Sequence, residues 1–365
     1  MTDPLTRRAR NRALLARQLL LARAPMTALA AIEHLVGMQA QAPHPPYTGL
    51  WSRLRDFDFA ELSTLMLERR VVRIALMRST IHLVTAEDCG PLRAALQPAM
   101  ERAFRSGSGK AFAGVDQDEI VAAGVELLAD EPVTFAELGR ALAPRWPDIP
   151  PDRLSALVRT RIPLVQTPPR GVWGRAGQAR HVTAAAWLGA DDRPPLPLQD
   201  LVRRYLAAFG PATVADAQTW SGCTGLREVF DRLAPELRVF RDEDGRDLYD
   251  LPAAPRPDPD TPAPVRLVAG FDNLILSHAD RAHVIPEQHR LTVIMGTGNG
   301  IVRPTVLVDG VVAAMWEFER ARKAAAVVVS PFGKLTARVR GEIEAEARLL
   351  LAVTDPTAAH EVRFA

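Results

Sequence analysis

The 365-residue sequence predicts an α+β fold, with three tandem winged-helix motifs followed by a small C-terminal β-barrel or β-sheet with one long helix. Three observations support this prediction. A Pro-x-Thr pattern occurs three times, similar predicted elements surround each copy, and a proline-rich segment separates the copies from a β-rich end. The content of 47% apolar and 24% charged residues is typical of a globular protein, and the length allows several domains.

The repeated pattern reads PMTALAAIEHL at 25–35, PVTFAELGRAL at 132–142 and PATVADAQTW at 211–220. Threonine is a good helix N-cap because its hydroxyl accepts a hydrogen bond from a backbone N–H of the first turn. In the second and third copies an acid, Glu137 or Asp216, follows the threonine by three residues and completes or approximates a capping box. Each threonine therefore predicts the start of a helix of about ten residues.

The elements predicted around the three copies also repeat. Each copy follows an amphipathic helix and precedes a second helix and a strand–turn–strand segment. The preceding helices are predicted at 5–20, 118–129 and 198–209, the following helices at 59–69, 152–161 and 224–233, and the hairpins at 71–85, 163–175 and 237–251. This order is the winged-helix plan. A generic α+β domain with coincidental threonine caps is the alternative.

Residues 252–264 contain six prolines in thirteen residues, so a stiff, extended linker is predicted there. β-rich runs with GTGNG and DG turns follow it, and then a helix. The runs lie at 265–270, 291–295, 301–319 and 325–331, and the helix is predicted at 334–353. The predicted domains are 1–115, 116–192, 193–252 and 265–365.

Arginine carries almost all the positive charge, because Lys110, Lys323 and Lys334 are the only lysines. Arginine suits phosphate recognition, since its planar fork binds oxygens in pairs. One acid, Asp3, accompanies the six arginines of the N-terminal segment, which are Arg7, Arg8, Arg10, Arg12, Arg17 and Arg23. This segment is interpreted either as a phosphate-contacting face or as a solvated helix face.

The two cysteines, Cys89 and Cys223, lie far apart and have no C-x-x-C partner, so neither a metal site nor a disulfide framework is predicted. The N-terminus lacks the apolar region of a signal peptide, and no run of 18 apolar residues occurs. The sequence therefore predicts a cytoplasmic protein that does not insert into a membrane.

The first unit is longer than the other two. Between the capping threonine and the first hairpin strand it spans 44 residues, Thr27 to Val71, against about 29 and about 24 in the others. The extra residues fall at 38–54 and include Gln39 and Gln41. Extra segments on a scaffold are more often functional than the scaffold itself. A solvated or helix-capping role is the alternative for these glutamines.

Gln39-Ala40-Gln41 matches the mark of the AlkZ-like winged-helix DNA glycosylases, which is Gln, an apolar residue and Gln. The YcaQ-like sister branch has Asp at the last position, so Gln41 indicates the AlkZ-like branch. The stretches RSTIHLVTA at 78–86 and FDNLILSHADR at 271–281 also resemble this family. The resemblance covers nearly the whole chain.

The resemblance implies an enzyme that cuts the N-glycosidic bond of alkylated purines in double-stranded DNA without a metal or another cofactor. Founding members of the family protect antibiotic-producing bacteria from their own DNA-alkylating products. Family members act on bulky adducts, crosslinks or simple methyl groups, and the sequence does not identify the lesion.

A neutral amide suits this chemistry. Purines alkylated at N7 or N3 are cationic and leave without prior protonation, and their departure builds an oxocarbenium-like sugar. Such a reaction needs a positioned water and dipoles aimed at the positive charge. We expect a monofunctional enzyme in which Gln39 and Gln41 hold the water through their oxygens while their NH2 groups are anchored elsewhere. Both side chains would share one side of an extended segment, with Pro43, Pro45 and Pro46 favouring an extended exit.

Arg78, Thr80 and His82 alternate along a predicted strand and would share one face of it. They are interpreted as a polar strip that contacts the DNA backbone or the lesion. The alternative is that Thr80 and His82 are ordinary wing residues, with His82 bonded to the backbone.

Asn273, His278 and Arg281 belong to a polar stretch beside the apolar residues 274–276, which are expected to form a strand. They are interpreted as a loop that reaches the DNA near the glutamines. A structural hydrogen-bond network between domains is the alternative.

Two further functions remain open from the sequence: a winged-helix transcriptional regulator without catalysis, and a protein-interaction module. Regulators usually dimerise to read two half-sites, but the sequence shows no heptad pattern or obvious dimer helix. Three winged helices in one chain favour wrapping a duplex as a monomer.

Overall fold

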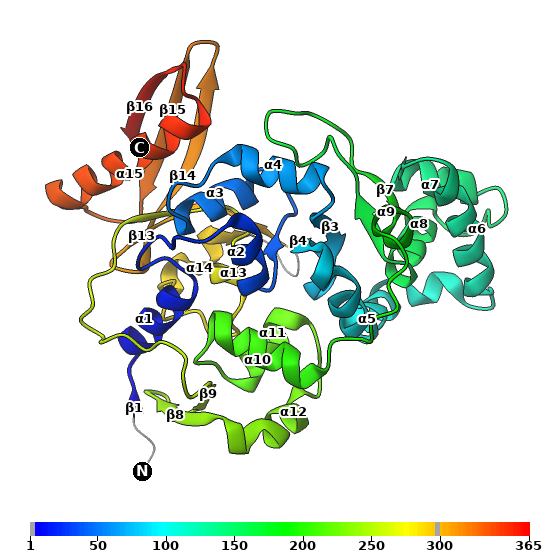
Figure 1. Cartoon of the computed structure of the whole chain (residues 1–365), viewed down its shortest axis with the longest axis horizontal. Helices are drawn as coiled ribbons and strands as arrows, with labels where there is room; N and C mark the ends of the chain where they lie inside the picture. Colours follow the sequence, from blue (N-terminus) through cyan, green and yellow to red (C-terminus); the bar gives the residue numbers. More distant parts are fainter. Residues whose placement is uncertain (1–3, 296–299) are drawn as a thin grey trace.

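The computed structural model describes residues 4–295 and 300–365, and its mixture of helices and sheets confirms the predicted α+β class (Figure 1). Three successive units in the described residues each contain helix, helix, helix and hairpin in that order. No helix in the described part of the chain is both long and apolar enough to cross a membrane.

The first unit carries the inserted segment. Its elements are α1 (Arg7–Arg17), α2 (Ala28–His34), β2 (Met38–Gln39), α3 (Pro45–Arg53), α4 (Phe59–Leu67), β3 (Val71–Ala75) and β4 (Ile81–Thr85). The hydroxyl of Thr27 accepts a hydrogen bond from the backbone N–H of Ala30 at 3.2 Å, which confirms the predicted cap. The insertion supplies β2 and α3, and α3 begins at Pro45, so the expected extended exit is wrong. Proline suits the first turn of a helix because no N–H is needed there.

The second unit is joined to the first by a long helix, α5 (Ala86–Ser108), that was not predicted. Its elements are α6 (Gln117–Asp130), β5 (Val133–Thr134), α7 (Phe135–Leu142), α8 (Pro151–Arg161), β6 (Leu164–Gln166), β7 (Arg180–Thr183) and α9 (Ala184–Leu188). Thr134 and Glu137 form the predicted capping box. The expected hairpin within 163–175 is wrong, because β6 pairs with the later β7. Pro168 and Pro169 have no N–H to donate to a strand ladder.

The third unit agrees most closely with its prediction. Its elements are α10 (Leu198–Phe209), α11 (Val214–Ser221), α12 (Leu226–Leu233), β8 (Arg238–Asp242) and β9 (Asp247–Asp250). Thr213 and Asp216 form a capping box at the start of α11. A two-residue strand near the N-terminus, β1 (Pro4–Leu5), pairs in parallel with β8.

The C-terminal sheet is open. It has the strand order β10-β13-β14-β15-β16, so β10 and β16 are edges, and the predicted alternative of a closed barrel is wrong for the described residues. The strands are β10 (Arg266–Val268), β13 (Thr305–Val308), β14 (Val311–Ala321), β15 (Ala324–Pro331) and β16 (Ala359–Phe364). The predicted long helix is α15 (Ala337–Thr354), whereas β16 was not predicted.

Two stretches expected as strands are helical. The stretch 274–276 lies in α13 (Asn273–Leu276), which the carboxylate of Asp272 caps, and 291–293 lies in α14 (Glu287–Val293), which follows Pro286. Short apolar runs do not distinguish a strand from a buried helix turn. Strands β11 (Ile294–Met295) and β12 (Ile301–Val302) pair antiparallel. The GTGNG turn predicted between them falls on residues 296–300, of which 296–299 lie outside the described residues.

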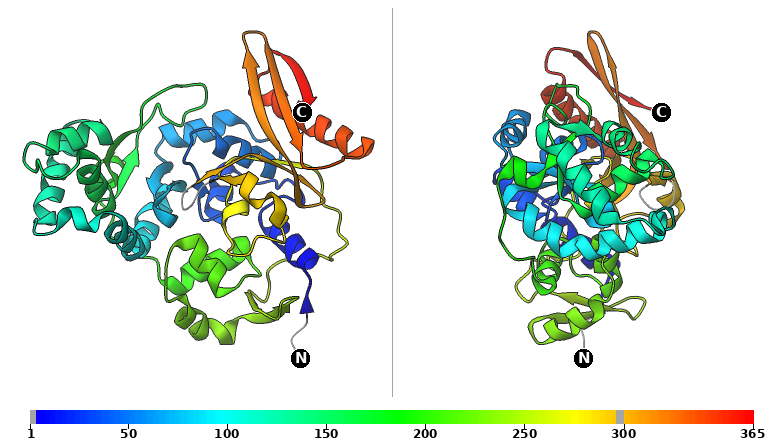
Figure 2. Two further views of the ribbon diagram at one scale, coloured as in Figure 1. Left: turned by 180° about the vertical axis from the view of Figure 1, so that it is seen from behind. Right: turned by 90° about the vertical axis from the view of Figure 1, so that its right-hand side faces the viewer.

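The units share sheets and cores. The six-stranded sheet has the order β2-β4-β3-β6-β7-β5, so it contains strands of both the first and second units. One hydrophobic cluster joins the first and third units to part of the C-terminal region, a second joins the first unit to the C-terminal sheet, and a third belongs to the second unit and α5. The four domain boundaries stay predictions. Figures 1 and 2 show α6, α7 and α8 at one end of the molecule and β14 to β16 projecting from the other.

Three arginines of α1 form ion pairs with carboxylates in other parts of the chain. Arg10 donates to Asp216 at 2.7 Å, Arg17 donates to Asp250 at 2.6 Å, and all four side chains are buried. A third buried arginine, Arg12, pairs with Asp309. Both sequence interpretations of this helix, a phosphate-contacting face and a solvated face, are therefore wrong for these three arginines. They dock α1 onto the third unit and the C-terminal region.

Candidate active site around Gln39 and Gln41

Gln39 is the last residue of β2, one of the two edge strands of the six-stranded sheet. Strand β2 runs antiparallel to β4 and places Gln39 opposite His82. The backbone N–H of Ala40 donates to the carbonyl of Ile81 at 2.7 Å, and the buried guanidinium of Arg73 donates to the carbonyl of Ala40 at 2.7 Å. The backbone on both sides of Ala40 is thus held by the first hairpin.

The two glutamine side chains lie in different environments. Gln39 is only 6% exposed, and its Oε1 accepts a hydrogen bond from Arg78 at 2.8 Å. Gln41 is exposed, and its Oε1 accepts from the backbone N–H of Ile81 at 3.1 Å. Guanidinium and backbone N–H groups only donate, so the atom facing each of them is the amide oxygen. The expected arrangement, with anchored NH2 groups, is therefore reversed: the oxygens are the anchored atoms.

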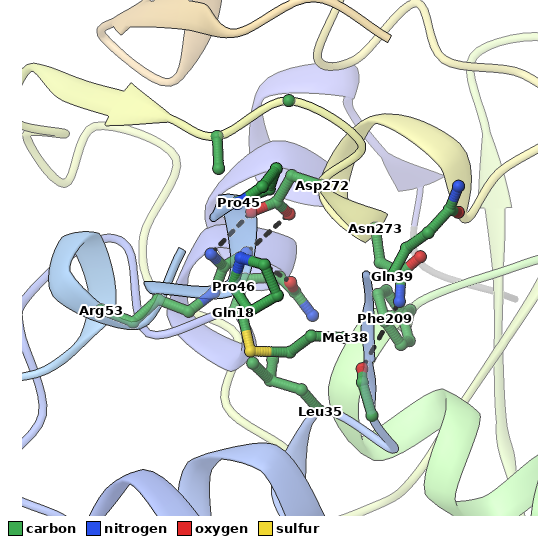
Figure 3. Close-up of a pocket in the computed structure, with 13 residues that line it drawn as sticks. Gln18, Leu35, Met38, Gln39, Pro45, Pro46, Arg53, Phe209, Asp272 and Asn273 are labelled. Atoms are coloured by element: carbon green, nitrogen blue, oxygen red, sulfur yellow. Dashed lines mark hydrogen bonds and ion pairs between the residues drawn. The ribbon is translucent and has the colours of Figure 1, made fainter. Parts of the chain in front are cut away.

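A narrow cleft with a cavity volume of about 10 Å³, enough for about one water molecule, lies beside Gln39. It is lined by residues of the first unit, of the third unit and of the stretch between β10 and α13: Gln18, Leu35, Gly37, Met38, Gln39, Pro45, Pro46, Arg53, Phe209, Ala269, Gly270, Asp272 and Asn273. Gln41 is not among them. Figure 3 shows Gln39 and Asn273 close together on one side and the pair of Arg53 and Asp272 on the other.

The stretch 271–281 meets the glutamine segment, as expected. Asp272 is buried and accepts two hydrogen bonds from Arg53, both at 2.8 Å. The amide NH2 of Asn273 donates to the carbonyl of Gly37 at 3.4 Å. These contacts fasten α13 to the insertion and to the chain just before β2. Sequence reasoning missed the roles of Arg53 and Arg73, because neither lies in a recognisable local motif.

Arg78 contacts Gln39 but does not lie on a strand. Strand β4 begins at Ile81, so of Arg78, Thr80 and His82 only His82 lies on one. Arg78 belongs to a 3-10 turn, η1 (Met77–Ser79), and has a left-handed backbone with φ of 55°. Its guanidinium donates to the carbonyl of Trp220 and, at 3.4 Å, to Oδ1 of Asn273. Burial, together with the charge of Arg281, lowers the pKa of Arg78 to about 10.

Thr80 and His82 are buried, so in this structure neither can contact DNA. Thr80 donates to the carbonyl of Met77 at 3.0 Å, and Nδ1 of His82 lies 3.0 Å from the carbonyl of Thr80. Burial and the nearby charge of Arg78 lower the pKa of His82 to about 3, so the ring is neutral. The alternative interpretation, ordinary residues bonded to the backbone, describes them correctly.

His278 and Arg281 differ in accessibility. His278 is buried, its Nε2 lies 3.0 Å from the carbonyl of Phe209, and burial lowers its pKa. It belongs to the structural network between units rather than to a DNA-facing loop. Arg281 is partly exposed, and burial of part of its side chain lowers its pKa. Arg281 stays a proposed DNA contact. Asn273 is buried, and its side chain contacts the carbonyl of Gly37.

Among the described residues, no group of three or more His, Cys, Asp or Glu side chains could hold a metal ion. Both Cys89 and Cys223 are buried and unpaired.

Comparisons with known proteins agree on one family. The family model described as DNA glycosylase AlkZ-like matches residues 32–353. An interstrand DNA cross-link repair glycosylase of Streptomyces sahachiroi is 26% identical over 343 residues, which cover 87% of this chain and 88% of that protein. The structure of Streptomyces sahachiroi DNA glycosylase AlkZ is similar over 100% of both chains, with a TM-score of 0.80 and 22% identity. At that identity the structural likeness shows the fold alone.

Proposed function

Because this chain belongs to the AlkZ-like DNA glycosylase family and is therefore a DNA glycosylase, we propose that it hydrolyses the N-glycosidic bond of cationic alkylated purines, N7-alkylguanine and N3-alkyladenine, in double-stranded DNA. The similarity to an interstrand DNA cross-link repair glycosylase supports bulky adducts and crosslinks as substrates. Membership of an enzyme family sets aside the two non-catalytic functions that the sequence left open.

The observation that carries this proposal is the fixed position of two neutral amides in the insertion, one of which, Gln39, lines the cleft. Gln39 is held by Arg78, and Gln41 is held by the backbone of Ile81. Each amide oxygen has a second lone pair, and each NH2 group has two N–H donors, so both side chains can bind further polar atoms. We place both at the reaction centre, where the attacking water adds to C1′ of the deoxyribose.

The balanced reaction needs little acid–base help from the protein. The bond between C1′ and N9 breaks, and its electron pair neutralises the cationic purine. The water oxygen bonds to C1′ and releases its proton to solvent. The enzyme is monofunctional in this scheme, because water rather than an amine attacks the sugar. We further propose that the three helical units are winged helices that wrap the duplex and that the protein acts as a monomer.

Release of free base is the direct test of this function. Purified protein is incubated with duplex DNA that carries N7-methylguanine, N3-methyladenine or a bulky N7 adduct, and the freed base is measured by mass spectrometry. We expect base release from at least one alkylated duplex and none from unmodified DNA. A folded protein that releases no base from any of these duplexes would contradict the proposal.

The excision rate is expected to be nearly constant from about pH 5 to about pH 9, because Arg78, which contacts Gln39, and His82, which lies opposite it on β4, keep their charge states there. His82, with a pKa of about 3, stays neutral above that value, and Arg78, with a pKa of about 10, stays charged below it. Single-turnover rates across this range check the prediction. A bell-shaped profile would instead reveal a titrating acid or base at the reaction centre.

A further inference from the structure

Arg78 stands where three parts of the molecule meet. Its turn follows β3 in the first unit, its guanidinium donates to the carbonyl of Trp220 at the end of α11, and it also reaches Asn273 at the start of α13. A Cβ atom added to Gly222 would lie 3.4 Å from the backbone nitrogen of Arg78, so the chain after α11 packs against this turn. The left-handed backbone of Arg78 is unfavourable for a residue with a side chain, so the surrounding contacts hold it.

The guanidinium of Arg78 sets the orientation of two neighbouring side-chain amides, those of Gln39 and Asn273. It has only N–H donors, so Gln39 and Asn273 both turn their oxygens towards it. Asn273 then uses its NH2 group on the carbonyl of Gly37. Among residues 4–295 and 300–365, no group accepts a hydrogen bond from Nε2 of Gln39. Both N–H donors of Gln39 are therefore without a protein acceptor among these residues, whereas its oxygen already has Arg78 as a partner.

The charge of Arg78 strengthens that donor. No described carboxylate lies within ion-pair distance of Arg78, so its nearby hydrogen-bond acceptors are amide and carbonyl oxygens. A charged donor on an amide oxygen polarises the amide, which makes its NH2 group a better donor in a site of low dielectric constant.

A strong hydrogen-bond donor stabilises the transition state only on the purine side of the breaking bond. The sugar becomes positive as the bond between C1′ and N9 breaks, so an N–H dipole aimed at it would oppose the reaction. The purine gains electron density on its unalkylated ring nitrogens, and an N–H dipole aimed at one of them stabilises the transition state.

We propose that Arg78 is a positioning residue that turns Oε1 of Gln39 away from the substrate, so that Gln39 donates through Nε2 to a ring nitrogen of the departing purine while Gln41 holds the water. This inference rests on the proposed function and assigns different roles to the two glutamines. Gln39 is the catalytic residue in this scheme, and Arg78 acts through it.

Substitution by glutamate separates donor from acceptor roles at position 39. Gln39→Glu keeps an oxygen for Arg78 but removes the NH2 donor. We expect its single-turnover rate on N7-methylguanine duplex to fall as far as that of Gln39→Ala, about 100-fold. A Gln39→Glu variant that retains the wild-type rate would overturn the donor role.

A double-mutant cycle tests whether Arg78 acts through Gln39. Arg78→Met is expected to slow excision about tenfold to a hundredfold without changing the Kd for the duplex, and Arg78→Lys to recover part of that rate. In the Gln39→Ala background, Arg78→Met is expected to cause no further loss. Equal losses in both backgrounds, or weaker DNA binding in place of slower chemistry, would overturn the coupling and indicate a phosphate contact.

Arg102→Met is a matched control, because Arg102 is also partly buried and donates to the carbonyl of Gly222, 3.0 Å away, without contacting Gln39. It is expected to keep the wild-type excision rate. Thermal melting of every variant identifies any that fail to fold. Wild-type protein that releases no base would refute the proposed function itself. A fully active Gln39→Ala variant would leave that function standing and would overturn the catalytic role of Gln39, and with it the role of Arg78.

Discussion

Replacement of Asp250 by alanine is expected to lower the free energy of unfolding by about 3–5 kcal/mol, because it leaves the buried Arg17 without its counter-charge. The side chain of Asp250 is 0% exposed and accepts hydrogen bonds from Arg17 at 2.6 and 2.9 Å, from Arg256 at 2.6 Å and from the backbone of Leu251 at 2.8 Å. Arg17 is equally buried and would retain only backbone carbonyls as partners.

Chemical denaturation followed by circular dichroism measures this loss, and a neighbouring carboxylate provides its control. Asp247 starts the same strand, β9, but its side chain is 45% exposed in its ion pair with Arg241. We expect Asp247→Ala to cost at most about 1 kcal/mol, since exposed pairs contribute little. If both variants unfolded at the wild-type denaturant concentration, the pair of Arg17 and Asp250 would contribute nothing measurable.

Replacement of Gln39 by alanine is expected to slow base excision about 100-fold while leaving the Kd for alkylated duplex unchanged. The alanine removes the amide that Arg78 holds beside the cleft but leaves the backbone pairing of β2 with β4 intact. A loss confined to the chemical step is the mark of an interaction made mainly in the transition state. Single-turnover kinetics and fluorescence anisotropy with a labelled duplex measure the two quantities separately.

Two further glutamine variants sharpen this measurement. Gln41→Ala is expected to slow the same step, since Gln41 is the proposed holder of the water. Gln117→Ala is the control, because Gln117 is a partly exposed glutamine at the start of α6 in the second unit, distant in sequence from the insertion. If Gln39→Ala and Gln41→Ala both excised base at the rate of Gln117→Ala, neither glutamine would belong to the reaction centre.

The local sequence predicted the elements whose ends are decided within a few residues. Thr27, Thr134 and Thr213 each cap a helix because hydroxyl and backbone N–H lie only three residues apart. Helix α10 occupies 198–209, the range that its amphipathic pattern predicts. Such features depend on propensities that the chain carries wherever it packs.

Elements that depend on distant partners were predicted less well. Strand β7 pairs with β6 across a loop that contains Pro168 and Pro169, and β16 pairs in parallel with β15 on the far side of α15. The stretch 274–276 forms a helical turn because Asp272 caps it and Arg53 holds Asp272 in place. Pairing and capping of this kind follow from tertiary packing, which short apolar runs do not encode.

The same division holds at the candidate site. The sequence by itself determined that a Gln-x-Gln segment was inserted in the first of three similar units. Only the tertiary structure decided how that segment is held: Arg78 reaches Gln39 across 39 positions of sequence and Asn273 across 195. The physical reason is that an amide both donates and accepts, so the partners that packing brings to it decide which end it offers to a substrate.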